Sequence, residues 1–374
     1  MRILSLNYET ALGSVIHATP MFAALRHLHP NWEVHVACAG MPAEILHRNP
    51  SIGVIHHTAS PINATLRAAF QFIIIGRQYK YDALLLNSGN SRSRIAWNGC
   101  FIDSKVRIGV SAKSRFLDIS YGMQEGRSVA ANNLQVLKPI IANFDEIRYA
   151  EAFEVFWGPA ERDRAIAFRR NLLSDRRPLI GFVTQTSGGQ PSEWWDERFC
   201  TVATTLNGLN GAVMAFFGSL EQQERITAIQ RRVGANAISL AGQTTLGELG
   251  ALCAACDLLI SLDTGTMHIG RAVGVPMVVI APAWQPAWEW LPINQEKIKV
   301  LRRWDIGCRH CRKTHCASHE CMDEISAAEV ITAALDQLMR FSSSNGQWLE
   351  RVERWVRVKQ QDHGIPRKHR VSTV

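Results

Sequence analysis

The stretch "DLLISLDTGTMHIGRAVGVPMVVIAP", residues 257–282, decides the fold of this chain. Its apolar run at 258–262 predicts a buried strand, and the residues from about Met267 to Val273 predict a helix. Gly274 ends that helix, and a second apolar strand follows at once. A strand, a helix and a strand in this order form a βαβ unit, which indicates a parallel sheet covered by helices.

The same alternation runs along the chain and starts again after about residue 150. The strands that we predict lie at 2–6, 33–37, 82–87, 105–110, 178–183, 211–217, 236–240, 257–262, 276–281 and 297–301. We therefore predict an α/β fold of two Rossmann-like, doubly wound domains that face a central cleft. The predicted parts are an N-terminal domain at 1–155, a C-terminal domain at 156–340 with a Cys-rich loop at 308–321, and an amphipathic helix and basic tail at 341–374.

Composition and charge limit the classes of function. The chain has 374 residues, with 47% hydrophobic and 20% charged residues, as in ordinary globular proteins. No apolar run is long enough to span a bilayer, and the N-terminus lacks the pattern of a signal peptide, so we expect a cytoplasmic protein. The net charge of +8 suits an anionic partner. Binding to nucleic acid is disfavoured, because clustered aromatic residues on a basic face are missing apart from the tail tryptophans.

Ligands of doubly wound domains bind beyond the carboxyl ends of the strands. Three loops are therefore expected to line the cleft: 7–14, 184–192 and 262–268. In the last of these, the orphan N–H groups of the helix start and the neighbouring Thr hydroxyls can hold a diphosphate, and His268 can donate to a phosphate or a sugar. The alternative is a well-capped crossover helix with a histidine in the core.

Five segments in order resemble one known family: "MRILSLNYETALGSVIHATPMFAALRHLHPNWEVHVAC", "KVRIGVSAKSRFLDISYGMQEGRSVAANNLQVL", "PLIGFVTQTSGGQPSEWWDERF", "ISLAGQTTLGELGALCAACDLLISLDTG" and "SLDTGTMHIGRAVGVPMVVIAP". They resemble glycosyltransferase family 9, the ADP-heptose:lipopolysaccharide heptosyltransferases and their relatives. The resemblance extends to about residue 335. It implies a GT-B fold and sugar transfer with inversion at the anomeric carbon, without a catalytic metal. It also implies an ADP-heptose-like donor on the second domain and a glycolipid or glycan acceptor on the first.

The resemblance carries a set of binding residues onto this chain. The donor residues that it implies are Gly13, Thr184, Thr186, Ser187, Ser192, Glu221, Gln243, Asp263, Thr264, Gly265, Thr266 and His268. An acidic acceptor, such as the core of lipopolysaccharide, would suit the cations of the acceptor-side segment, which are Lys105, Arg107, Lys113 and Arg115. An ordinary basic surface loop is the alternative. The resemblance further suggests that the terminal helix packs back on the first domain, and its basic face would allow peripheral contact with the inner membrane.

Two departures from the family bear on the mechanism. The family's catalytic aspartate in "LGD" is replaced by Ser14, which cannot act as a base without a group that takes its proton. The phosphate-binding lysine usual before the aromatic of the "SGGQPSEWW" loop is replaced by Ser192. We predict His17 or Glu9 as the local base, with Asp118 as a weaker candidate. The chain is then either a transferase with a relocated base or a catalytically impaired paralogue that binds a nucleotide sugar.

The stretch "CRHCRKTHCASHEC" carries the remaining motif. Cys308, Cys311, Cys316 and Cys321 have the spacing C-x2-C-x4-C-x4-C, which predicts a structural zinc or iron site. A set of reduced thiols in a loop is the alternative.

Overall fold

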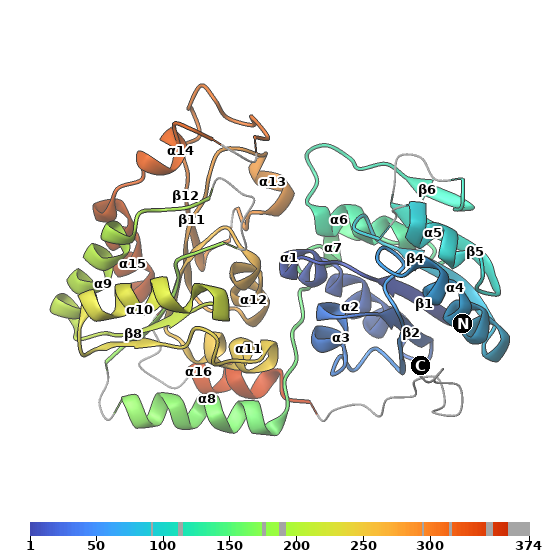
Figure 1. Ribbon diagram of the computed structural model, residues 1–374, viewed down its shortest axis with the longest axis horizontal. Helices are drawn as coiled ribbons and strands as arrows, with labels where there is room; N and C mark the ends of the chain where they lie inside the picture. Colours follow the sequence, from blue (N-terminus) through green and yellow to red (C-terminus); the bar gives the residue numbers. More distant parts are fainter. Residues whose placement is uncertain are drawn as a thin grey trace. The chain divides into compact units, whose positions relative to one another are not determined.

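The computed structural model describes the whole chain except residues 91–92, 111–114, 174–176, 187–191, 294, 314–315, 342–346 and 358–374. Two compact units make up the protein. The first holds Met1–Phe156 together with Arg357 of the described residues, and the second holds Trp157–Val356. Each unit is built on a six-stranded parallel sheet (Figure 1).

The sheet of the first unit has the strand order β3-β2-β1-β4-β5-β6. Its strands are β1 (Arg2–Asn7), β2 (Glu33–Cys38), β3 (Val54–His57), β4 (Tyr81–Leu86), β5 (Ser104–Val110) and β6 (Ile119–Tyr121). Its helices are α1 (Leu12–Ile16), α2 (Thr19–Leu28), α3 (Met41–Leu46), α4 (Thr65–Gln78), α5 (Ser93–Gly99), α6 (Val129–Leu134), η1 (Gln135–Leu137) and α7 (Glu146–Tyr149).

The helices of the first unit fall into two groups. Helix α4 contacts α5, whereas α1 contacts α3, and α2 contacts α6 and α7. Right-handed crossovers place such groups on opposite faces of a doubly wound sheet. On the side of α4, Phe72 and Ile75 pack on Leu4, Leu6 and the strand residues beside them, so burial of this apolar stripe fixes the helix on the sheet.

The sheet of the second unit has the strand order β12-β11-β10-β7-β8-β9. Its strands are β7 (Leu179–Val183), β8 (Val213–Phe217), β9 (Ala237–Ser239), β10 (Leu258–Leu262), β11 (Met277–Ile280) and β12 (Ile298–Leu301). Its helices are α8 (Pro159–Leu172), α9 (Asp196–Asn210), η2 (Leu220–Gln222), α10 (Gln223–Val233), α11 (Leu246–Ala255), α12 (Gly265–Val273), α13 (Ala287–Trp290), α14 (Glu320–Asp323), α15 (Ala327–Phe341) and α16 (Gln347–Arg354).

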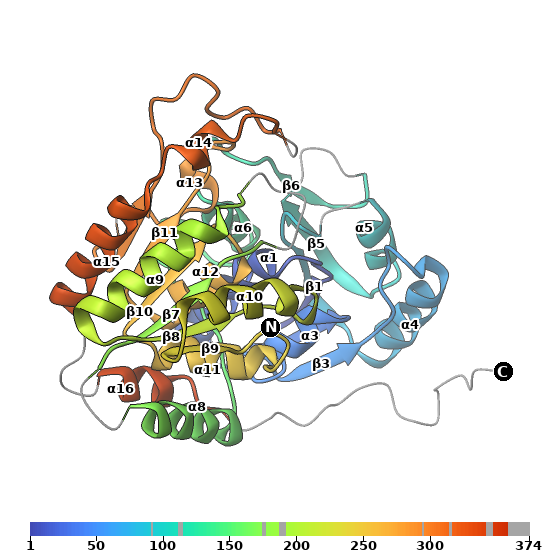
Figure 2. The same ribbon diagram turned by 60° about the vertical axis from the view of Figure 1, so that its left-hand side comes forward.

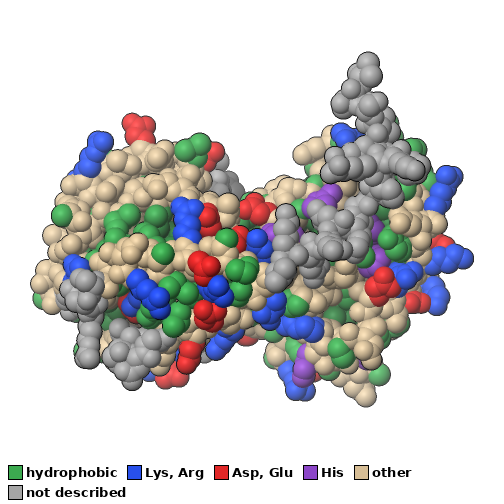
Figure 3. All heavy atoms as spheres, turned by 90° about the horizontal axis from the view of Figure 1, so that it is seen from below, with side chains coloured by type: hydrophobic (Ala, Val, Ile, Leu, Met, Phe, Trp, Pro, Cys, Tyr) green, Lys and Arg blue, Asp and Glu red, His purple; other side chains and the backbone are tan. Residues whose placement is uncertain are grey.

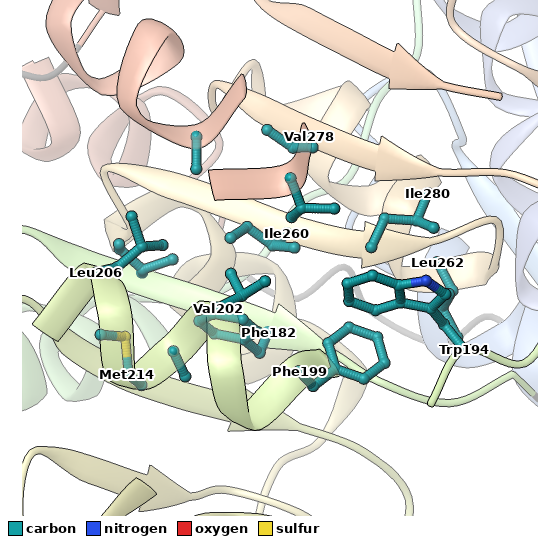
Figure 4. Packing of buried hydrophobic residues seen from close by; sticks show 14 of the residues in the cluster. Phe182, Trp194, Phe199, Val202, Leu206, Met214, Ile260, Leu262, Val278 and Ile280 are labelled. Atoms are coloured by element: carbon teal, nitrogen blue, oxygen red, sulfur yellow. The ribbon is translucent and has the colours of Figure 1, made fainter. Parts of the chain in front are cut away.

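The core of the second unit lies between its sheet and the group of α9, α10 and α15. Figure 4 shows Phe182, Met214 and Ile260 of the strands facing Val202 and Leu206 of α9. These strands are buried on both faces, which explains why they read in the sequence as continuous apolar runs. Helices α8, α11, α12 and α16 form the other group, in which α11 contacts the remaining three.

The terminal helix corrects one expectation. Helix α16 packs on α8 and α11 of the second unit and not on the first domain. Its Arg351 is buried and donates to the carbonyl oxygens of Ala254 and Cys256, which end α11. The indole of Trp157 donates to the Val352 carbonyl at 3.0 Å. The bonds from Arg351 satisfy carbonyl oxygens at the C-terminal end of α11, which have no partner within that helix. They thereby hold α16 against α11.

The surface bears on two further expectations. Among the described residues, no helix is long and apolar enough to cross a membrane. On the face drawn in Figure 3, Lys and Arg side chains alternate with Asp and Glu side chains and do not gather into one basic field. Ion pairs between the two kinds of side chain include Arg303 with Glu329 and Arg225 with Asp196. The net charge is therefore a poor argument for a nucleic-acid surface on this face.

Candidate functional site

Each sheet changes winding direction between two neighbouring strands. In the first unit these strands are β1 and β4, and in the second they are β7 and β10. The pairs are in register up to their carboxyl ends, where Leu6 faces Leu86 and Ser261 faces Val183. The loops that follow such a pair separate to opposite faces and leave room for a ligand between them. A candidate residue fits the site when it lies on a loop next to one of these two points.

At the switch point of the first unit, Glu9 lies between the loops after β1 and β4. Its Oε1 accepts hydrogen bonds from the side-chain amides of Asn87, at 2.5 Å, and Asn90, at 2.6 Å. The Asn90 amide oxygen in turn accepts from the backbone N–H of Tyr8 at 2.6 Å. A Cβ atom at Gly89 would lie 3.1 Å from Cγ of Glu9, so glycine at this position leaves room for the carboxylate.

The environment of Glu9 makes it a weak acid. Burial raises its pKa from the ordinary 4.5 to about 7, and the bonds from Asn87 and Asn90 only partly offset the rise. The second oxygen, Oε2, is buried and accepts no hydrogen bond from a described residue. A carboxylate with this pKa and a spare oxygen is suited to remove a proton near neutral pH.

The other two local candidates have different surroundings. Ser14 is half-buried in the short helix α1, as is Gly13. His17 caps the end of that helix and is buried, with its ring 5.0 Å from the ring of Phe153. Its backbone carbonyl accepts from the Asn133 side chain at 3.2 Å. His17 is thus packed into the domain core, which favours a structural role.

The predicted acceptor cations do not gather at this switch point. Lys105 lies at the amino end of β5 and forms an ion pair of 2.6 Å with Asp82. Arg107 pairs with Asp118 at 3.0 Å, and this contact lowers the pKa of the Asp118 carboxyl, the weaker candidate for a base. The guanidinium of Arg115 lies 5.0 Å from the ring of the neighbouring Phe116, and Lys113 lies outside the described residues. We grouped these cations because they are close along the chain. In the structure, the three that are described do not lie together at the carboxyl edge of the sheet.

At the switch point of the second unit, α12 begins directly after β10. Thr264 is the N-cap in an extended conformation, but its side chain makes no capping bond. Thr264, Gly265 and Thr266 are half-buried, and of the first-turn N–H groups that of Met267 donates to the Thr264 carbonyl at 3.0 Å. The helix starts two residues earlier than the sequence indicated, at Gly265.

Two titratable groups of this motif are buried. Burial raises the pKa of Asp263 to about 6, and the positive charge of Arg302 opposes part of this rise. Burial and the positive charge of Arg271 lower the pKa of His268 to about 3, so this imidazole is neutral at physiological pH. Arg302 follows β12, is buried, and donates to the carbonyl oxygens of Pro282, Ala283 and Gln285. No motif or spacing in the sequence indicated this arginine.

The loop after β7 offers polar groups beside the same point. The Thr184 hydroxyl, the Gln185 side-chain amide and the Ser192 hydroxyl are buried and have no hydrogen-bond partner among the described residues. Buried polar groups normally have a partner, so unsatisfied donors near one loop indicate a place for a ligand. Thr186 is also buried, and Ser187 lies outside the described residues. Gln185 is a residue that the sequence analysis did not single out.

The loops after β8 and β9 adjoin this region. The Gln222 amide donates to the Thr186 carbonyl at 2.9 Å, which places η2 and its exposed Glu221 beside the β7 loop. The Gln243 side chain is exposed and donates to the Ser239 carbonyl at 2.9 Å. The extra negative charge of Glu193 is balanced by Arg225 at 2.7 Å. The predicted donor residues that the structure describes in the second unit therefore lie on neighbouring loops at the carboxyl edge of its sheet, whereas Gly13 belongs to the first unit.

The Cys-rich loop is only partly consistent with a metal site. Cys321 is buried in α14, Cys311 and Cys316 are half-buried, and Cys308 is exposed. Three residues of this loop, His310, Arg312 and His319, have positive φ angles of 58°, 51° and 48°, which is unusual outside glycine. Within the described residues, which omit 314–315, no group of three ligands has the arrangement of a metal site. The zinc or iron site stays a prediction.

Comparison with known proteins decides the family. The sequence model of glycosyltransferase family 9 (heptosyltransferase) matches residues 76–322. The chain belongs to glycosyltransferase family 9. Within this family it is 30% identical over 322 residues to lipopolysaccharide heptosyltransferase 2 of Salmonella typhimurium, covering 78% of this chain and 85% of that protein. It is 24% identical to lipooligosaccharide heptosyltransferase 2 of Haemophilus ducreyi, covering 88% and 97%.

Solved structures of the family confirm the fold. A family 9 glycosyltransferase from Veillonella parvula superposes with a TM-score of 0.77 at 23% identity, covering 91% of this chain and 97% of that one. ADP-heptose lipopolysaccharide heptosyltransferase II of E. coli gives a TM-score of 0.71 at 18% identity, covering 91% and 99%. The predicted α/β architecture of GT-B type, with two Rossmann-like domains, is thus confirmed, and the chain is a glycosyltransferase of the heptosyltransferase type.

Proposed function

We propose that this chain transfers a heptose, or a related sugar, from an ADP-type nucleotide donor to the core of lipopolysaccharide or another cell-surface glycan, with inversion at the anomeric carbon. The names of the relatives support the donor and acceptor classes. The observation that carries the proposal is the Glu9 carboxylate, because it supplies the base that Ser14 lacks. Without such a base, the substitution at Ser14 would favour the impaired paralogue.

Glu9 meets the requirements of a general base better than its neighbours. Its pKa of about 7 gives both a substantial ionised fraction at neutral pH and a useful affinity for the proton. Oε1 is held by Asn87 and Asn90, so the carboxylate is oriented while Oε2 remains able to accept. Ser14 has no comparable chemistry, and the ring of His17 is packed against Phe153.

The transfer is a single displacement. The oxygen of an acceptor hydroxyl attacks the anomeric carbon while the bond from that carbon to the β-phosphate oxygen breaks. The hydroxyl proton passes to Oε2 of Glu9, and the nucleoside diphosphate leaves with the bonding electrons. Attack from the face opposite the leaving group inverts the configuration, and no covalent sugar–enzyme intermediate forms.

Residues of the second unit would hold the donor. The first turn of α12 and the hydroxyls of Thr264 and Thr266 would bind the diphosphate, since helix N-termini favour anions. The unsatisfied groups of Thr184 and Gln185 would add donors beside it. His268, neutral at physiological pH, would donate one hydrogen bond to a phosphate or sugar oxygen.

A cation is still needed to stabilise the leaving diphosphate, because Ser192 stands where the family usually has lysine. Arg271 is the candidate that we propose. It lies one turn after His268 on α12, and its positive charge lowers the pKa of that imidazole. Its guanidinium donates to the Trp290 carbonyl at 3.3 Å and is half-buried. A charge-assisted contact of this kind contributes about 1.5–3 kcal/mol.

Purified protein with ADP-heptose and lipopolysaccharide core acceptors tests the proposal by the release of ADP. We expect turnover by the wild type and a 10²- to 10⁴-fold lower kcat for Glu9→Gln, with unchanged affinity for ADP. Ser14→Ala is the matched control and should retain most of the activity. Adding Ser14→Asp to Glu9→Gln should restore part of the turnover, because the resemblance places the family's aspartate there. Donor binding by the wild type without any turnover would establish the impaired paralogue instead.

A further inference from the structure

The outward face of α4 is apolar and has no partner among the described residues of its unit. Leu66 is 80% exposed and Phe70 is 53% exposed, and they lie one helical turn apart on the same side. Ile73 and Ile74 continue this side half-buried. Among the described helices, α4 is alone in carrying two large apolar side chains at such exposure.

This face, defined by Leu66, Phe70, Ile73 and Ile74, is distinct from the stripe that holds the helix on its sheet. The opposite side of α4 buries Ala68, Phe72 and Ile75 against the strands. Folding of the unit is therefore complete without the outward face. Exposed apolar side chains gathered on one helix indicate a surface that is covered by something else in use.

All charged residues of α4 itself are basic, and so is Lys80 beyond its end. Arg67 lies in the first turn of α4 and Arg77 in its last turn, and both are exposed. Lys80 follows the helix, and the exposed Arg94 of α5 reaches the entry to α4 by donating to the Ile62 carbonyl at 3.0 Å. Figure 2 shows α4 and α5 next to each other at one edge of this unit.

Acidic residues are absent from this part of the chain. No Asp or Glu occurs between residues 45 and 81. The exposed Asp103 borders α4, and its backbone nitrogen would lie 3.1 Å from a Cβ at Gly76. The next acid along the chain, Asp82, is engaged by Lys105 at 2.6 Å.

We propose that the outward face of α4 docks the protein onto an anionic lipid surface. A helix with an apolar side flanked by arginines lies in the plane of a bilayer interface, with apolar side chains among the acyl chains and cations at the headgroups. Positive charges near such a surface each strengthen binding about fivefold. A second copy of this chain would bring the same arginines against each other, so like charges oppose that occupant.

Docking on a lipid surface is a property separate from the proposed sugar transfer, and vesicle binding can be measured without any transfer activity. Sugar transfer to a lipid-linked acceptor would benefit from such docking, but vesicle binding needs neither donor nor acceptor. A chain that binds vesicles and transfers no sugar would refute the proposed function alone, and an active chain that ignores vesicles would refute this inference alone.

Co-sedimentation of the full chain with vesicles, in the absence of substrates, is the test. We expect binding to vesicles of phosphatidylglycerol and phosphatidylethanolamine, and at least tenfold weaker binding to vesicles of phosphatidylcholine alone. The double variant Leu66→Ser/Phe70→Ser should lose about tenfold or more in partitioning, and Arg67→Glu/Arg77→Glu should lose at least as much, with the remaining binding insensitive to salt.

The control removes apolar side chains of similar exposure from the second unit. Leu209→Ser/Met339→Ser changes residues that are 61% and 80% exposed on α9 and α15, and it should bind vesicles like the wild type. Thermal melting reports whether each variant is folded. Equal loss in the control and the α4 variants would overturn the proposal, as would failure of the wild type to bind. Sedimentation velocity detects the alternative occupant, a second copy of the chain. If the wild type is a dimer that does not bind lipid, and Leu66→Ser/Phe70→Ser dissociates this dimer, the face serves self-association and the proposal is refuted.

Discussion

Replacing Glu9 by glutamine should stabilise the first unit at alkaline pH while it lowers kcat about 10²- to 10⁴-fold. In the native state the Glu9 carboxyl has a pKa of about 7, raised by burial from the ordinary 4.5. Between these two values the native state holds a proton that the unfolded chain has lost. The free energy of unfolding therefore falls as the pH rises through this window, and the loss is complete above about pH 7.

The size of this loss follows from the change in proton affinity. Each tenfold change is worth about 1.4 kcal/mol, so a shift from 4.5 to about 7 corresponds to a few kcal/mol at most. Glutamine keeps an oxygen that can accept from Asn87 and Asn90 but never ionises. The unfolding free energies of Glu9→Gln and wild type should thus agree near pH 4 and differ by about 3 kcal/mol at pH 8, in favour of the variant.

Hydrogen exchange of peptides from β1 and β4, corrected for intrinsic rates, measures the opening free energy of this unit alone. Glu224→Gln, at an exposed position of α10, retains Glu9 and is the control, so its opening free energies should follow those of the wild type. The same titration of wild-type activity should show an acid limb near pH 7. A difference between Glu9→Gln and wild type that stays constant from pH 4 to pH 8 would refute the assignment of a raised pKa, and with it the argument for the base.

Three other predictions concern separate parts of the molecule. Arg271→Gln should weaken ADP binding about tenfold or more by calorimetry, whereas Arg231→Gln, an exposed arginine of α10, should not; equal affinities would remove Arg271 from the donor site. Burial lowers the pKa of His56 to about 3 from the ordinary 6.5, so the first unit should lose stability as the pH falls from 6.5 towards 3. His56→Gln should reduce that loss in acid unfolding, and an unchanged slope would contradict it. Metal analysis of the purified protein should find zinc or iron that Cys308→Ser lowers, and metal-free wild type would exclude the predicted site.

The sequence was informative about the fold because buried parallel strands read as apolar runs. Every strand that the sequence predicted is present in the two sheets. The two strands that it missed, β3 (Val54–His57) and β6 (Ile119–Tyr121), are short edge strands with polar residues, and neither has a continuous apolar run. The partner of the terminal helix was also wrong, because the choice between two domains depends on the carbonyls at the end of α11, which no sequence period reveals.

The candidate site was predictable where a polar residue comes directly after a strand. Asp263 and Thr184 come immediately after β10 and β7, so position along the chain and position at the sheet edge coincide. The same signal could have found Asn87, which follows β4 directly. Contacts made across the sequence could not be found in this way. Arg302 lies about forty residues beyond Asp263, and the two come together only through the order of β10, β11 and β12.

Under the proposed assignment of Glu9 as the base, the carboxylate that the family carries at the position of Ser14 is supplied instead from the loop after β1. The switch point between β1 and β4 fixes a location at the sheet edge, and any residue of the following loop that reaches this location can carry the base. Glu9 reaches it from five residues upstream of Ser14, with one methylene more than aspartate. Asn87 and Asn90 come from the other loop of the same switch point and hold its carboxylate. Because these amides are neutral, they orient the group without forcing it to ionise, and burial can still hold its pKa near 7. A lysine or arginine in their place would have produced an ordinary ion pair with a low pKa, which would bind a proton poorly at neutral pH.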